Sequence, residues 1–182
     1  MCHFVTAVLP AHAPHAALDA IARRHKRQLQ PQSNPSLAAQ IGPQRRAYLT
    51  TLAHCDCGTV IGSARARARR APDWDNEERQ LRKRGWSAAK VARALAQKQE
   101  RAAASEQSDV ETSAVQCDAW VGLLNEALKA GADEFGLLLH AYSGPLDEEI
   151  TLRGREIVPV DAAAEMLEQM REDVLYVFVP KR

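Results

Sequence analysis

Four short apolar runs divide the chain, at residues 4–9, 47–53, 135–142 and 174–179. Runs of this length that end at Pro, Gly or a polar cluster are typical of buried strands. The pattern therefore predicts two strands in the first third of the chain and two in the last third. Weaker apolar runs at 150–152 and 157–160 predict two further short strands.

A helix is predicted between the two strands of each pair. The first falls within residues 14–31, where apolar residues recur at helical spacing and Pro31 ends the pattern. Asp161 is a suitable N-cap for the second helix, which precedes the last strand. Residues 32–43 contain Pro, Ser, Asn and Gly and predict a loop rather than a helix.

About eighty mostly helical residues are expected between the second and third strands, a segment far longer than a hairpin turn. Asp73 or Asp75 begins one predicted helix, which Gly85 ends, and Ser87 begins another that reaches about Ala104. A capping box over 108–111 predicts the start of a third helix, with an apolar stripe that includes Cys117. The predicted helical insert spans 59–131.

The predicted order is strand, helix, strand, insert, strand, helix, strand. This order matches the βαββαβ pattern of ferredoxin-like sheets, with the central hairpin replaced by the insert. We therefore predict a single α+β domain over 1–182, built on a small, mainly antiparallel sheet. The fold pattern implies no activity, since one fold carries many functions.

Composition is that of a globular protein, with 46% hydrophobic and 26% charged residues in 182. No apolar run approaches the ~20 residues of a membrane span, and the N-terminus lacks a basic leader before an apolar core. These features predict a cytoplasmic protein with no membrane partner, whose four cysteines are reduced. The net charge of +1 conceals a basic stretch at 65–101 and an acidic one at 133–173.

The most distinctive local motif is His54-Cys55-Asp56-Cys57-Gly58, directly after the second predicted strand. His54, Cys55 and Cys57 are ligand types that zinc prefers, and zinc needs a fourth group. The remaining candidates are Cys2, His3, Cys117 and His140. In a ferredoxin-like sheet the start of the first strand lies far from the end of the second, so Cys117 is the preferred fourth ligand.

Other interpretations of the same cysteines remain open. The simplest explanation is that Cys55 and Cys57 are small buried residues around a turn that Asp56 stabilises. A Cys-x-Cys pair also forms strained, reducible disulfides suited to thiol redox chemistry. Removal of Met1 would make Cys2 an N-terminal nucleophile, but that class usually has a larger two-sheet sandwich than this chain predicts.

The basic part of the insert suggests nucleic-acid or partner binding, because residues 81–95 superficially resemble a helix-turn-helix. The candidate contact residues are Arg65, Arg67, Arg69, Arg70, Arg82, Lys83, Arg84, Trp86, Lys90 and Arg93. The alternative is a solvated helical hairpin whose arginines cover alanine surface or pair with the acidic half of the chain. The pI of about 7.7 is low for a dedicated nucleic-acid-binding domain.

Known catalytic fingerprints do not occur in the sequence, which has no serine nucleophile elbow, Walker loop or glycine-rich dinucleotide motif. We therefore expect a small bacterial protein-binding module without an active site, with the insert as contact surface and another protein as partner. A regulatory or toxin-neutralising immunity protein is one concrete version. The alternatives are a zinc-binding or thiol-redox protein and a nucleic-acid binder.

Overall fold

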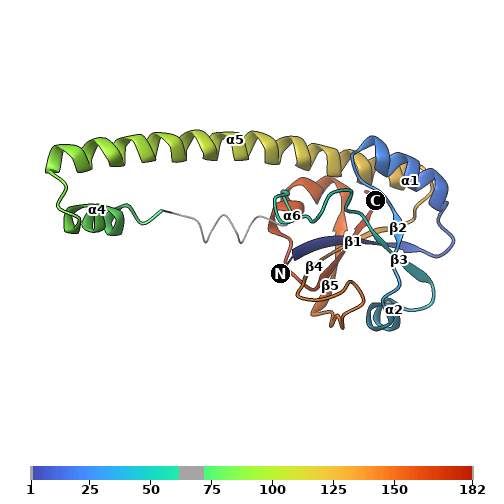
Figure 1. Cartoon of the computed structure of the whole chain (residues 1–182). Helices are drawn as coiled ribbons and strands as arrows, with labels where there is room; N and C mark the ends of the chain where they lie inside the picture. The colour runs from blue at the N-terminus through green and yellow to red at the C-terminus, as the bar shows by residue number, and fades with distance from the viewer. Residues whose placement is uncertain (1, 62–71, 182) are drawn as a thin grey trace. The chain divides into compact units, whose positions relative to one another are not determined.

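A computed structural model describes residues 2–61 and 72–181, without the side chains of 105–110 (Figure 1). The chain divides into two compact units. The first contains the described residues of 1–64 together with 115–182, and the second those of 65–114. Helices and strands are both present, so the predicted α+β class is confirmed. The single domain with an insert at 59–131 stays a prediction.

The first unit is built on a six-stranded sheet in the order β2-β3-β1-β4-β6-β5. The four predicted strands correspond to β1, β3, β4 and β6. Residues 157–159 of the second weaker run lie in β5, whereas residues 150–152 are not part of a strand. All neighbours are antiparallel except β5 and β6, which are parallel. The strands are β1 (Cys2–Pro10), β2 (Gln30–Pro31), β3 (Arg45–Leu49), β4 (Phe135–Tyr142), β5 (Gly154–Pro159) and β6 (Val174–Val179).

The ferredoxin-like arrangement is not confirmed. A βαβ unit joins parallel strands, whereas β1 and β3 are antiparallel neighbours, with Thr6 opposite Leu49. The chain that leaves β3 after Leu49 therefore heads toward the start of β1. This reversal decides which side chains meet at that end of the sheet.

One face of the sheet carries the larger core. Val5 of β1 and Leu137 of β4 are fully buried there, together with Leu18, Trp120 and Leu167. These three come from α1 (His15–Arg24), α5 (Ala88–Lys129) and α6 (Ala163–Gln169), the last preceded by the 3₁₀ helix η1 (Val160–Ala162). Strand side chains alternate between faces, so these helices bury one face of the sheet (Figure 1).

The opposite face is covered by α2 (Pro35–Ile41), in a region predicted to be a loop. That prediction was wrong because the Pro and Asn residues there start a helix. Asn34 accepts a hydrogen bond from the backbone N–H of Leu37 at 2.9 Å, and Pro35 occupies the first turn. Leu37 and Ile41 lie four residues apart on one helical face and are buried.

The second unit is helical and contains α4 (Trp74–Lys83) and the first part of α5. Asp73, rather than Asp75, caps α4, and Gly85 has a φ of +79° in the turn that follows, as expected for a glycine that ends a helix. The break predicted near residues 104–108 does not exist, since α5 is one helix of 42 residues. Its sequence has neither Pro nor Gly between Ala88 and Val121, so the capping box does not interrupt it.

Candidate functional site

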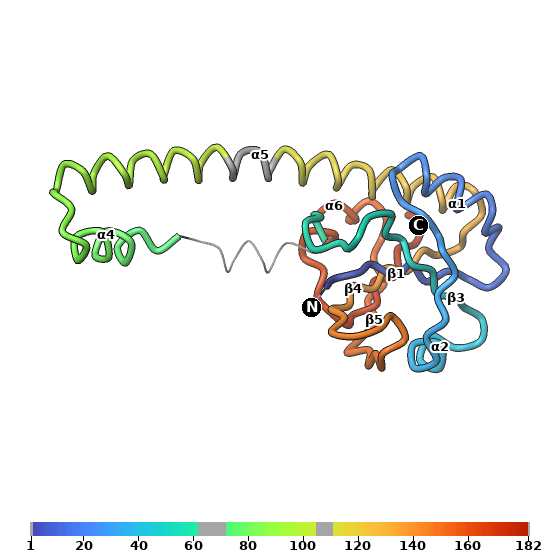
Figure 2. The backbone as a smooth tube through the Cα atoms, in the orientation of Figure 1, coloured from blue at the N-terminus to red at the C-terminus, as the bar shows by residue number. Residues whose placement is uncertain are grey.

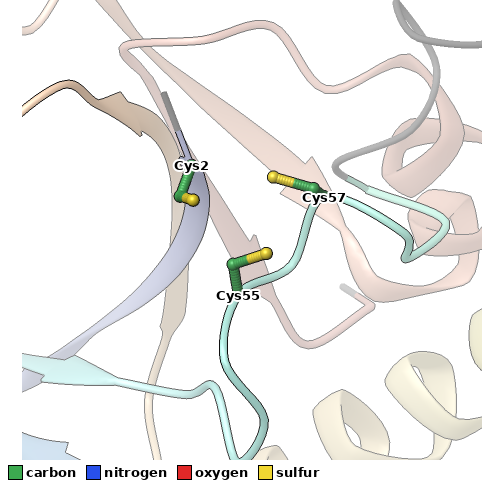
Figure 3. A group of neighbouring side chains, drawn as sticks. All are labelled: Cys2, Cys55 and Cys57. Carbon is green, nitrogen blue, oxygen red and sulfur yellow. The ribbon is translucent and has the colours of Figure 1, made fainter.

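Three cysteine sulfurs converge at one end of the sheet. Cys2 lies at the start of β1, and Cys55 and Cys57 lie on the segment after β3. The three sulfur atoms are within 4.8 Å of one another, and Figure 3 shows the side chains directed toward a common space. All three residues are half-buried free thiols. We call Cys2, Cys55 and Cys57 the cysteine cluster.

The backbone of β1 holds the segment after β3 in place. The backbone N–H of Thr50 donates to the carbonyl of Val5 at 3.1 Å, and that of Asp56 to the carbonyl of His3 at 2.8 Å. In return, the backbone N–H of His3 donates to the Cys57 sulfur at 3.1 Å. Figure 2 shows this teal segment beside the start of β1. Backbone hydrogen bonds to β1 thus continue past the end of β3 and reach the cysteine cluster.

Asp56 anchors this segment from inside the protein, with only 1% of its surface exposed. Its carboxylate accepts hydrogen bonds from the backbone N–H of Val5 at 3.0 Å, from Arg27 at 2.6 Å and from the Thr51 hydroxyl. The Arg27 guanidinium also lies 4.4 Å from the centre of the Trp120 ring. A buried carboxylate with these partners fixes the backbone between Cys55 and Cys57.

A histidine and a carboxylate flank the cluster. His3 Nδ1 lies 3.7 Å from the Cys57 sulfur, and His3 Nε2 lies 3.0 Å from Glu172 Oε1. A histidine whose second nitrogen is held by a carboxylate is the usual arrangement beside a metal, because the carboxylate orients the ring and raises its basicity. Both side chains are about one-fifth exposed.

The thiols of the Cys-x-Cys pair ionise differently. Hydrogen bonds from the backbone N–H of Cys57 and from its thiol lower the pKa of Cys55. Burial raises the pKa of Cys57, against the smaller opposite effect of the His3 backbone N–H. The lowered pKa of Cys55 and the raised pKa of Cys57 favour Cys55 as the thiolate of the pair.

This donor set fits a zinc ion. Tetrahedral coordination with Zn–S distances near 2.3 Å requires sulfur–sulfur separations of about 3.8 Å, so no pair in the cluster must close by more than about 1 Å. A thiolate–imidazole separation in such a site is about 3.6 Å, close to the 3.7 Å between Cys57 and His3. The cluster supplies three ligands. His3 Nδ1 lies 3.7 Å from the Cys57 sulfur, but His3 is not part of the group whose ligand atoms all lie within 4.8 Å of one another, so its ring would have to move to complete the site.

Of the four residues predicted as metal ligands, the structure brings Cys55 and Cys57 together, and it places Cys2 rather than His54 or Cys117 beside them. His54 is exposed and lies outside the cluster. Cys117 is buried in α5, where its thiol donates to the carbonyl of Ala164 at 3.6 Å. Cys2 was set aside because a ferredoxin-like sheet would separate it from Cys55, and the antiparallel β1–β3 pairing removes that objection.

The sequence motif gave no sign that His3 and Glu172 contact each other in this site. They are 169 positions apart, and their contact depends on the bridge between Leu139 and Glu172 beside β1 and β4. His140, the other candidate ligand, has Asp173 at 2.6 Å and Glu148 at 3.3 Å from its two ring nitrogens. Both ring nitrogens of His140 therefore contact carboxylates.

The residues predicted to contact nucleic acid or a partner divide into two groups. Arg65, Arg67, Arg69 and Arg70 lie outside the described residues. Of the others, Arg82 pairs with Glu78 at 2.6 Å and Lys90 lies 4.0 Å from the centre of the Trp86 ring, while Lys83, Arg84 and Arg93 are exposed. Their role in binding stays a prediction.

In the part of the chain that the structure describes, none of the helices combines the length and apolarity needed to cross a bilayer. No protein-family profile, curated protein or solved structure matches this chain.

Proposed function

We propose that this protein binds a zinc ion through the thiolates of Cys2, Cys55 and Cys57. The observation that carries the proposal is the convergence of these three sulfurs within 4.8 Å from two segments more than fifty residues apart. Thiolates are soft ligands, and a sulfur-rich tetrahedral site favours zinc over magnesium or calcium. The buried Asp56 supports the proposal, since it holds Cys55 and Cys57 in place independently of a metal.

His3 is the proposed fourth ligand, with Glu172 as the carboxylate that orients it. Nδ1 is the nitrogen that lies near the Cys57 sulfur, and Nε2 is the one that contacts Glu172. A closed set of three thiolates and one imidazole is typical of structural zinc sites. The ion would then clamp the start of β1 to the segment after β3 and contribute to folding. The four free cysteines suit the reducing cytoplasm that we propose as its compartment.

Elemental analysis of the untagged protein after gel filtration tests this proposal. We expect about one zinc per chain in the wild type and loss of most of it in Cys57→Ser. Cys117→Ser is the matched control, because Cys117 is outside the cluster and serine keeps its donor to Ala164. Equal metal content in the two variants would refute the assignment of ligands.

Thiol redox chemistry is the competing use of the same residues, favoured by the lowered pKa of Cys55 beside Cys57. It predicts a Cys55–Cys57 disulfide in the protein purified without reductant. Mass spectrometry after alkylation, before and after reduction, distinguishes the two states. A stable disulfide in metal-free protein would support the redox function over the zinc site.

Partner binding by the helical unit is a second candidate function. Leu81 and Val91 are the buried apolar residues in the part of 65–114 whose side chains are described, which is a small core for two helices. A second protein, of the regulatory or immunity type expected from the sequence, would add to that core. Nucleic acid is the alternative, because Lys83, Arg84 and Arg93 are exposed.

Purification of the native complex tests this second candidate. We expect a stoichiometric partner that remains bound through gel filtration and is lost when Trp86 is replaced by Ala. Recovery of the wild-type chain alone as a monomer would contradict it. Binding of generic duplex DNA that weakens steeply with salt would favour nucleic acid instead.

A further inference from the structure

A cavity of about 350 Å³ lies where the start of β5 meets α2 and β3. Its volume is within the range of small-molecule sites. Apolar side chains form part of its wall, and every charged side chain among its lining residues is an arginine. The lining residues used below are Ile41, Leu152, Leu175, Arg45, Arg153 and Arg155.

Two nearby carboxylates contact the three arginines of this cavity. Glu134 accepts from Arg45 Nε at 2.6 Å and from an Arg155 Nη at 3.3 Å. Asp173 lies 3.4 Å from Arg153 Nε and is also 2.6 Å from His140 Nδ1. Three guanidinium groups therefore face two carboxylates, one of them shared with a histidine, and the cavity carries an excess of positive charge.

The guanidinium groups also keep donors for a ligand. Arg45 donates to Glu134 through Nε, and Arg155 does so through one Nη nitrogen. A guanidinium has five N–H donors in a planar fork that matches the oxygens of a phosphate or carboxylate group. Ile41 and Leu175 are less than a tenth exposed, so the wall beside these donors is fixed by the core.

We propose that this cavity binds a small organic oxyanion, a phosphate monoester or a carboxylate attached to an apolar body. The oxyanion contacts the guanidinium groups of Arg153 and Arg155, and the apolar body packs against Leu152 and Ile41. Neither inorganic phosphate nor an uncharged aromatic compound satisfies both halves of this site. The site is separate from the cysteine cluster and does not depend on zinc.

Isothermal titration of the full chain tests the proposal with four probes: phenyl phosphate, benzoate, inorganic phosphate and phenol. We expect saturable binding of phenyl phosphate or benzoate, with Kd below about 1 mM and at least about tenfold tighter than for inorganic phosphate or phenol. The stronger of the first two identifies the oxyanion. No saturation by phenyl phosphate or by benzoate, up to about 10 mM, would overturn the proposal.

Charge-matched variants locate the binding. Arg155→Gln and Arg153→Gln are each expected to weaken binding of the stronger probe by about tenfold or more. Arg46→Gln removes the same charge from an exposed neighbour of Arg45 that donates to the carbonyl of Pro43, and it should change Kd less than about twofold. Equal weakening by all three variants would indicate nonspecific charge attraction and refute the site.

Discussion

Replacement of Asp56 by Asn tests whether a buried carboxylate holds the cysteine-bearing segment. The substitution keeps the size of the side chain but removes its charge, and it places an NH₂ group among donors. Arg27, which is 12% exposed, then keeps a largely buried positive charge without its partner. The backbone N–H of Val5 and the Thr51 hydroxyl donate to one carboxylate oxygen and Arg27 to the other, so the new NH₂ group must face one of these donor sets.

The expected loss is about 3–5 kcal/mol of unfolding free energy, the usual cost of removing one partner from a buried ion pair. This is a large part of the ~5–15 kcal/mol that stabilises a typical domain. With a urea m-value of about 2 kcal/mol per M, the midpoint of unfolding should fall by about 1.5–2.5 M. Urea titration followed by circular dichroism, in buffer with a chelator, measures this change without a contribution from bound metal.

Asp133→Asn is the matched control for this experiment. Asp133 pairs with His12 at 3.0 Å, but both side chains are more than two-thirds exposed. The control should therefore lower the unfolding free energy by less than about 1 kcal/mol. An equal effect of the two substitutions, or a loss below about 1 kcal/mol for Asp56→Asn, would refute the proposed anchor.

The structure makes three further predictions. In metal-free protein, Cys55 should react with iodoacetamide at a lower pH than Cys57, because the pKa of Cys55 is lowered and that of Cys57 is raised. Peptide mass spectrometry measures the order of alkylation, and earlier reaction of Cys57 would contradict the prediction. Glu172→Gln should weaken zinc binding by about 10–100-fold in a competitive chelator titration, and unchanged affinity would exclude a supporting role for this carboxylate. Gly136→Ala should cost about 1–3 kcal/mol in urea unfolding, because the added Cβ lies 2.9 Å from the Val8 carbonyl oxygen. Gly154→Ala, whose Cβ meets no atom within 4 Å, is its control, and similar losses for the two would contradict the packing argument.

Local signals in the sequence were sufficient for most elements of the fold. The apolar runs at 4–9 and 174–179 lie within β1 and β6, and Asp73 and Gly85 mark the ends of α4 as expected. These features depend on neighbouring residues alone. The loop predicted at 32–43 failed because Asn34 and Pro35, read as turn residues, are equally favourable at a helix start.

Strand pairing was the feature that local signals did not determine. The same order of strands and helices fits several sheets, and the choice of a ferredoxin-like one moved Cys2 away from Cys55 and Cys57. The observed register, with Thr6 opposite Leu49, reverses that conclusion. His3 and Glu172 meet through a different long-range contact, the pairing of β1 with β4 and the bridge between Leu139 and Glu172, so no spacing in the sequence could have revealed them.

The most direct test of the zinc site is a titration of metal-free protein with zinc, followed by elemental analysis and by a count of reactive thiols. The proposal predicts about one bound zinc per chain and protection of Cys2, Cys55 and Cys57 from alkylation. The reactivity of Cys117, which is limited by burial, should be the same with and without zinc. Less than about a tenth of an equivalent of zinc, with the three thiols as reactive as before, would contradict it.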